Sequence, residues 1–140
     1  MATLGVFTDE FYNASAKMSS GLYVATTQNG GTLTAVQLCG AQENYLALSG
    51  QTGAQALTTD TAVNIIARLL GMGVPNIVGL SFFTQLVNNN TSSGAITLTG
   101  GTGVTITGTN TIAITTSRQY LVTVTGPTTI TFQNVGSGTV

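Results

Sequence analysis

The sequence has no histidine and no tryptophan, and it contains one cysteine among its 140 residues. Without histidine, neither Ser-His-Asp nor Cys-His catalysis is available, and the commonest metal ligand is missing. A zinc site built from cysteine and histidine is excluded for the same reason. The lone Cys39 cannot form an internal disulfide, which is typical of a protein made in a cytoplasm. We expect Cys39 itself to be a small buried apolar residue.

Charged residues are also scarce. Only 5% of the residues are Asp, Glu, Lys or Arg, and the net charge is -1, whereas about a quarter of an ordinary soluble domain is charged. Lys17, Arg68 and Arg118 stand singly, so the clustered cations that a nucleic-acid binder needs are missing. Low net charge favours association. We therefore expect a homo-oligomer whose partners include neither nucleic acid nor an anionic membrane.

Long apolar runs are absent as well. The longest helix-like apolar stretch, Ala62–Leu70, contains Asn64 and Arg68 and is about half of the roughly 20 residues that a membrane-spanning helix needs. The N-terminus lacks the basic and apolar regions of a secretory signal, and acidic Asp9 and Glu10 stand early in it. We expect no membrane partner.

The first part of the chain, residues 1–56, has a mixed character. Thr8 can cap a short helix over Asp9–Ser19, and the two acidic residues that open it suit the positive end of the helix dipole. Gln28-Asn-Gly-Gly lies between the β-like runs 22–27 and 32–36, which predicts a β-hairpin. Residues 45–48 form another expected strand. We interpret this part as an arm that attaches the protein to a larger shell.

The best helix pattern covers Thr59–Gly71. Thr58 or Thr59 can cap this helix, and Asp60 falls in its first turn. Gly71, Gly73 and Pro75 end it. A helix of this length with one apolar face should pack on a sheet. The expected apolar stripe consists of Ala62, Val63, Ile66, Leu69 and Leu70.

Residues 76–140 are expected to be β throughout. The expected strands are separated by turns rich in glycine or asparagine, and they cover residues 80–87, 95–99, 104–107, 111–115, 119–125 and 129–135. This pattern predicts a mainly β fold, an antiparallel β-sandwich or jelly-roll-like domain over residues 57–140 with one short packed α-helix. Thr-x-Thr begins at positions 97, 105, 109, 123 and 129 without a constant period, which counts against a solenoid.

Few residues could carry chemistry. The carboxylates could include a glycosidase-like pair, but helix first turns explain all of them except Glu43; the four are Asp9, Glu10, Glu43 and Asp60. Asn88–Asn90 offers oxygens for calcium without a D-x-D-x-D-G loop, and is expected to be a turn. β-like residues follow Gly100–Gly103, which predicts a strand-to-strand turn rather than a phosphate loop. We predict no catalytic, cofactor-binding or metal-binding residue.

Arg118 is the only charged residue after Arg68. It either ends a solvated strand or binds a carboxylate or backbone carbonyls at a subunit interface. The aromatic residues of the expected strands belong to the core more readily than to a sugar-binding platform; they are Phe82, Phe83, Tyr120 and Phe132.

An ordered series of short segments begins at Leu57. It consists of Leu57-Thr-Thr-Asp-Thr-Ala-Val-Asn-Ile-Ile, Val78-Gly-Leu-Ser-Phe-Phe with Val87-Asn-Asn following, Gly101-Thr-Gly-Val-Thr-Ile-Thr-Gly-Thr-Asn-Thr-Ile-Ala, Thr116-Ser-Arg-Gln-Tyr-Leu-Val-Thr-Val-Thr and Val135-Gly-Ser-Gly. In this order the segments resemble a β-rich domain of virion structural proteins from tailed phages and large algal DNA viruses. The resemblance implies a capsid- or fibre-associated protein of the virion that performs no catalysis.

The resemblance and the low charge lead to the same expectation for partners. We expect a minor capsid, decoration or head-fibre protein that assembles as a homotrimer and docks to the major capsid protein or another virion protein. We expect this protein, including its predicted domain 57–140, to be non-enzymatic and to bind no cofactor. The alternative is an extracellular binding module whose Thr-rich β surface holds carbohydrate or ice.

Overall fold

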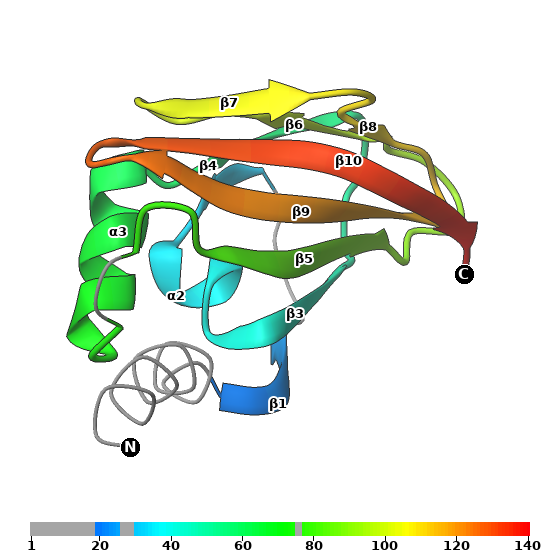
Figure 1. Cartoon of the computed structure of the whole chain (residues 1–140). Helices are drawn as coiled ribbons and strands as arrows, with labels where there is room; N and C mark the ends of the chain where they lie inside the picture. The colour runs from blue at the N-terminus through cyan, green and yellow to red at the C-terminus, as the bar shows by residue number, and fades with distance from the viewer. Residues whose placement is uncertain (1–18, 26–29, 75–76) are drawn as a thin grey trace, which may run out of the picture.

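Strands dominate the structure because apolar and polar residues alternate along much of the chain. The computed structural model describes residues 19–25, 30–74 and 77–140. Sheet A contains, in spatial order, β1 (Ser19–Ala25), β3 (Ala41–Leu48), β5 (Ser81–Asn88), β9 (Thr116–Gly126), β10 (Thr129–Thr139) and β7 (Val104–Thr107). Sheet B contains β2 (Gly31–Leu33), β4 (Gln55–Thr59), β6 (Ile96–Thr99) and β8 (Thr111–Ile112). The described helices are α2 (Ala35–Leu38) and α3 (Ala62–Gly71), and Figure 1 shows α3 at one end of sheet A and the C-terminus at the other.

From β1 to β6 the chain passes alternately between the two sheets. Each new strand lies parallel to the previous strand of its own sheet, so β3 pairs with β1, β4 with β2, β5 with β3 and β6 with β4. Gly31 is the partner of Leu57, whereas Gln55 is the partner of Ile96, so successive turns of this winding differ in length. The winding therefore has no constant length in sequence.

The later strands extend both sheets. β8 pairs antiparallel with β6, and β9 pairs antiparallel with β5. β10 returns antiparallel beside β9, and β7 lies parallel to β10 at the edge of sheet A. A register shift in β10 between Asn134 and Gly136 bends the end of this hairpin.

The expected mainly β fold is confirmed, but the expected antiparallel arrangement is wrong. Among the described strand pairs, five are parallel and three are antiparallel. Parallel neighbours need a long return connection. Here each return crosses to the other sheet, and α2 and α3 lie within these connections. Local sequence patterns identify such strands but do not give their direction.

The expected hairpin around Asn29-Gly30 is also wrong, because β1 and β2 belong to different sheets. Val36, expected in a strand, lies in α2. Thr34 caps this helix: its side chain accepts a hydrogen bond from the Gln37 backbone N–H, and the Gln37 side chain accepts one from the Thr34 N–H at 2.8 Å. This reciprocal capping box favours a helical turn over continuation of the strand.

The second expected helix is confirmed as α3, with a later start. Thr61 caps it by accepting a hydrogen bond from the Asn64 N–H at 3.2 Å, whereas Thr58 and Thr59 belong to β4. Asp60 therefore precedes the helix instead of lying in its first turn. The expected apolar stripe is divided: the buried side consists of Ala62, Ile65, Ile66 and Leu69, whereas Val63 and Leu70 are 55% and 54% exposed.

The other strand predictions agree with the structure to different degrees. The expected strands 80–87, 95–99 and 104–107 correspond to β5, β6 and β7, and β9 and β10 are longer than expected. The expected helix over residues 9–19 lies outside the described residues except for Ser19, which begins β1. Strands from both sides of the expected boundary at residues 56 and 57 are hydrogen-bonded neighbours in both sheets.

The core lies between the two sheets and beneath the helices. Tyr120 and Phe132 from sheet A are fully buried, with ring centroids 6.2 Å apart. Phe82 also points inward, but Phe83 points to the other side of sheet A and is 37% exposed. The prediction of a core position is therefore correct for three of the four strand aromatics and wrong for Phe83. Sheet B contributes Leu33, Leu57, Leu98 and Ile112 to the core.

Candidate functional site

The carboxylates of the described residues are not brought together. Glu43 projects from the exposed face of β3, whereas Asp60 lies at the start of α3. Asp9 and Glu10 lie outside the described residues. Over residues 19–25, 30–74 and 77–140 no three His, Cys, Asp or Glu residues are grouped so that they could hold a metal ion. The described part of the chain thus presents neither a carboxylate pair nor a metal-ligand set.

Asp60 joins the beginnings of the two helices. One carboxylate oxygen accepts the Ala35 N–H at the start of α2 at 2.9 Å. The other accepts the Thr61 N–H at 2.8 Å and the Asn64 side-chain amide at 2.6 Å. Burial works to raise the pKa of Asp60, but the hydrogen bonds from Asn64, Ala35 and Thr61 together hold this pKa below its usual value. The geometry identifies Asp60 as a structural cap.

Cys39 is buried, as the sequence predicts. Its thiol donates to the Ala35 carbonyl oxygen, with a sulfur–oxygen distance of 2.9 Å. Burial raises the pKa of Cys39 to about 12 despite the nearby positive charge of Arg68. A thiol that stays protonated at neutral pH is a poor nucleophile, so Cys39 fills the core near α2 and α3.

The asparagine segment is only partly a connection: Asn88 ends β5, and Asn89 and Asn90 follow it in the loop that leads to β6. The side chains of Asn88 and Asn90 are engaged within the chain. Asn88 is buried and donates to the carbonyl oxygens of Gly94 at 2.8 Å and Ile112 at 3.2 Å. Asn90 donates to the carbonyl oxygens of Gln51 and Ser93. These amides fix the connection between β5 and β6, which leaves no open oxygen cluster resembling a calcium loop.

The glycine segment 100–103 joins β6 to β7, so the prediction of a strand-to-strand turn is confirmed. Gly101 donates its N–H to the Thr59 hydroxyl at 2.9 Å and packs against the backbone at the end of β4. A helix does not follow this segment, and a phosphate-binding loop is therefore not formed here.

Arg118 finds a carbonyl partner within its own chain. Its Nε donates to the Thr111 carbonyl oxygen at 3.1 Å. Because Arg118 lies on β9 of sheet A and Thr111 on β8 of sheet B, this bond connects the two sheets at one edge. A further contact of Arg118 with another subunit stays a prediction.

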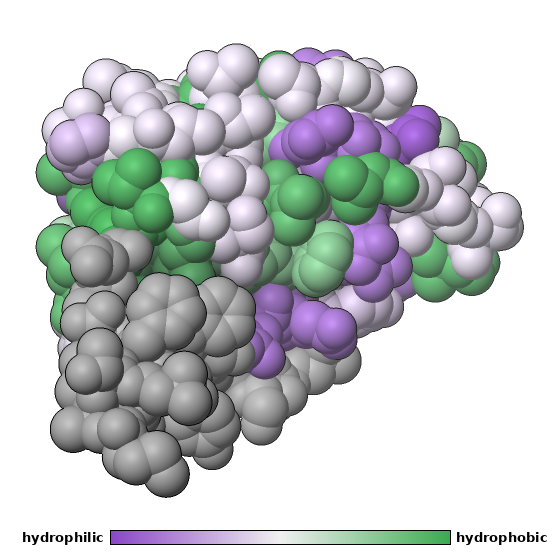
Figure 2. Space-filling view, viewed as in Figure 1, coloured by the Kyte–Doolittle hydropathy of each residue, from purple (hydrophilic) through white to green (hydrophobic). Residues whose placement is uncertain are grey.

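The outer face of sheet A carries three polar side chains in register. Tyr45, Gln85 and Gln119 are successive partners across β3, β5 and β9, and Gly136 continues the row on β10. Figure 2, which views this face, shows hydrophilic and apolar surfaces side by side over these strands. The outward-pointing Phe83 on β5 is 37% exposed.

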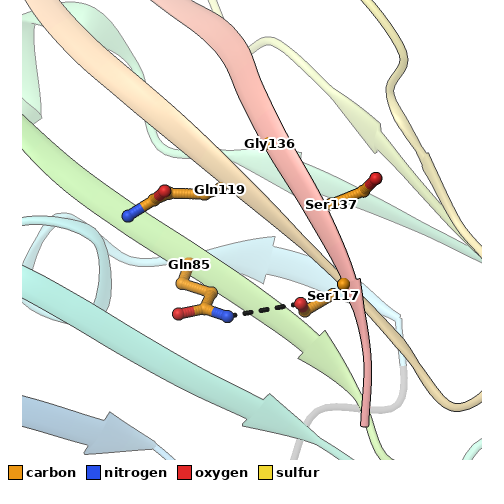
Figure 3. A pocket seen from close by; sticks show the side chains of 6 residues that line it. Gln85, Ser117, Gln119, Gly136 and Ser137 are labelled. Atoms are coloured by element: carbon orange, nitrogen blue, oxygen red, sulfur yellow. Dashed lines mark hydrogen bonds between the residues drawn. The ribbon is translucent and has the colours of Figure 1, made fainter.

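A shallow depression of about 180 Å³ lies within this row. Figure 3 shows Gln85, Ser117 and Gln119 around it, contributed by β5 and β9, with the backbone of β10 at its other side. The Gln85 side-chain amide donates to the Ser117 hydroxyl at 3.2 Å. The depression exists because Gly136 and Gly138 on β10 have no side chains beside Gln119 and Ser117. We call this site the glutamine depression.

The outer face of sheet B carries threonines in register. Thr32, Thr58 and Thr99 are successive partners across β2, β4 and β6, and Thr97 is the partner of Thr111 on β8. Their side chains point outward, because the alternate residues of these strands are buried. Neighbouring strands are about 4.8 Å apart, so these hydroxyls form short rows at a regular spacing. We call this surface the threonine face.

A third surface lies on α3. Val63, Ala67 and Leu70 are exposed and follow one side of the helix. Figure 2 shows apolar surface over α3 at its end of the molecule. The described residues contain no helix with the length and apolar character needed to cross a membrane. We call the exposed side chains of these three residues the α3 face.

Comparison with protein-family models, curated proteins and solved structures gave no significant match. The resemblance to virion structural domains therefore remains a prediction from the sequence. The candidate functional surfaces are the glutamine depression, the threonine face and the α3 face.

Sequence reasoning did not find the glutamine depression. Gln85, Gln119 and Gly136 are far apart in the sequence, and only the pairing of β5, β9 and β10 aligns them. The sequence does show glutamines at outward positions of the expected strands. Whether two of them lie side by side depends on the register of the strands, which the sequence does not give. The sequence shows the threonines as Thr-x-Thr pairs, but it does not show that threonines of neighbouring strands are aligned.

Proposed function

We propose that this chain is a non-enzymatic structural protein of a virus particle, a minor capsid, decoration or head-fibre subunit. It assembles with copies of itself as a trimer and docks to the major capsid protein or another virion protein. The observation that carries the proposal is the apolar α3 face on a chain with almost no charge. The ordered segments that resemble virion domains supply the class of particle.

The α3 face has the pattern of a helix that contacts another surface. Val63, Ala67 and Leu70 stand at helical spacing on one side, while Ile65 and Leu69 fill the core on the other. Covering exposed aliphatic surface stabilises an assembly by about 25 cal/mol per Å². With a net charge of -1, repulsion between copies is weak. We therefore assign the α3 face to contact between sister subunits.

Light scattering on the purified chain tests the assembly. We expect the wild-type chain, whose subunit mass is 14.2 kDa, to have the mass of a trimer. The double variant Val63→Asp/Leu70→Asp should be monomeric, because two carboxylates would be desolvated in the contact. Val140→Asp is the matched control, since Val140 is 59% exposed and lies at the C-terminus, away from α3. A wild-type monomer at high concentration would contradict the assembly, and an unchanged mass of the double variant would contradict its location.

A second experiment tests whether the protein is a component of the virus particle. Particles of the virus that encodes this chain can be purified by density gradient, and their proteins quantified by mass spectrometry. We expect the chain to be present at a fixed ratio to the major capsid protein. Its absence from intact particles would contradict a virion role.

The threonine face favours a second function, an extracellular binding module that holds ordered water at an ice surface. Thr32, Thr58 and Thr99 offer hydroxyls and methyl groups in one aligned row. Thermal hysteresis measures this activity. Thr58→Tyr should remove it by breaking the row, whereas Thr105→Tyr on β7 should not, because Thr105 belongs to sheet A. Absence of hysteresis in the wild-type chain would contradict this function.

A further inference from the structure

The glutamine depression has the donors and acceptors of a binding site. The Gln119 side chain has no hydrogen-bond partner within the described residues, so its amide can offer donors and an acceptor. Gln85 is held in place by its bond to Ser117. These side chains come from the neighbouring strands β5 and β9, and the backbone of β10 closes the third side of the depression (Figure 3).

The charge of the face restricts the class of ligand. Among the described residues, Glu43 is the only charged side chain that points outward from sheet A. An anionic ligand would need arginine or lysine to replace its hydration, and a cation would need more than one distant carboxylate. Amides and hydroxyls, in contrast, match a neutral ligand that presents both donors and acceptors. Sugar hydroxyl groups have this property.

The shape of the site restricts the size and form of the ligand. A volume of about 180 Å³ is below the roughly 300–1,000 Å³ of pockets that enclose small molecules. The depression is open to the surface and lies on a broad sheet (Figure 3). A ligand that lies along the surface and touches the depression with one or two units fits this shape better than a small molecule does.

Aromatic surface is available on the same face. Tyr45 stands in the row of Gln85 and Gln119, one strand beyond the depression. Phe83 is 37% exposed and lies on β5, two residues from Gln85. An aromatic ring can cover the apolar side of a sugar ring while amides bind its hydroxyls. We propose that the glutamine depression binds an uncharged oligosaccharide chain, which continues over the sheet toward Tyr45.

A printed array of neutral, sulfated and sialylated glycans tests the proposal, followed by calorimetric titration of the strongest neutral glycan. We expect binding to neutral glycans. Gln119→Ala should weaken it about tenfold, through the lost hydrogen bonds. Gly136→Leu should weaken it more by filling the depression. Gly136 has an ordinary backbone conformation, and the nearest atom to an added Cβ is 3.8 Å away, so the fold should accept the side chain.

Gln133→Ala is the matched control, because Gln133 is exposed on β10 but does not line the depression. Its affinity should stay within twofold of the wild type. Binding confined to sulfated or sialylated glycans, or to none, would overturn the proposal. Dissociation of the oligomer by Gly136→Leu would overturn it too, since a second copy of the chain would then occupy this face. The α3 double variant should keep its glycan binding, which separates this test from that of the assembly.

Discussion

At the scale of single residues, Asp60 connects two separate parts of the fold. Its two oxygens hold the starts of α2 and α3, which are separated in sequence by β3 and β4. Asp60→Asn should lower the free energy of unfolding by about 1–2 kcal/mol, because an amide cannot accept all the hydrogen bonds that the carboxylate accepts. Urea denaturation measures this change. Glu43→Gln, which removes an exposed carboxylate, should change the stability by less than about 0.5 kcal/mol.

The same residue predicts a pH dependence. The pKa of Asp60 in the folded protein lies below 3.8, so its ionised form is favoured by folding. The contribution of the Asp60 carboxylate to stability is therefore fully present above its ordinary pKa of 3.8. This contribution is lost as the pH falls through the lower pKa of the folded protein. The difference in Tm between the wild type and Asp60→Asn should narrow below about pH 4. A difference that stays constant down to pH 2 would contradict the capping role.

Cys39 gives a second prediction at this scale. Because burial raises the pKa of its thiol to about 12, the folded protein should react with iodoacetamide at pH 8 far more slowly than the unfolded chain. Mass spectrometry with and without urea measures the two rates. Rapid labelling of the folded protein would show that the region between α2 and α3 opens in solution.

At the scale of elements, the turn between β6 and β7 depends on the close approach of Gly101 to the end of β4. A Cβ at this position would lie 2.5 Å from the Thr59 carbonyl oxygen and 2.7 Å from that of Asp60. Gly101→Ala should therefore destabilise the protein by about 1–3 kcal/mol. Gly71→Ala is the control, because a Cβ there meets no atom within 4 Å and alanine favours a helix. Thermal unfolding of the two variants should show shifts of opposite sign.

The elements also show how far the sequence predicts this fold. The alternation in β7 and the existence of the helix α3 follow from local patterns, and both predictions are confirmed. The buried side of α3 is predicted only in part, because Val63 and Leu70 are exposed and Ile65 is buried instead. The hairpin at Asn29-Gly30 failed because the pairing of β1 with β3 and of β2 with β4 overrides a local turn pattern. The parallel direction and the row of Gln85 and Gln119 arise from the same long-range pairing, so neither could be predicted locally.

At the scale of the whole molecule, the two sheets cross the boundary expected at residues 56 and 57. β4 and β5 have β2 and β3 as partners, and Leu33, Leu46 and Leu48 complete the core. A fragment of residues 57–140 should therefore lack a cooperative thermal transition, whereas the full chain should show one. Circular dichroism measures both. A cooperative transition in the fragment would contradict this expectation and support an independent domain.

The winding of the chain has a consequence for its synthesis on the ribosome. When residues up to Thr99 have emerged from the ribosome, β5 and β6 can pair with their earlier partners but not with β9 and β8, which follow later. Each sheet then ends in an open strand that can pair with another nascent chain. Long-range pairing of this kind is slow to form. The last strands thus act as intramolecular protection, and truncation before Thr116 should yield aggregates rather than a smaller folded protein.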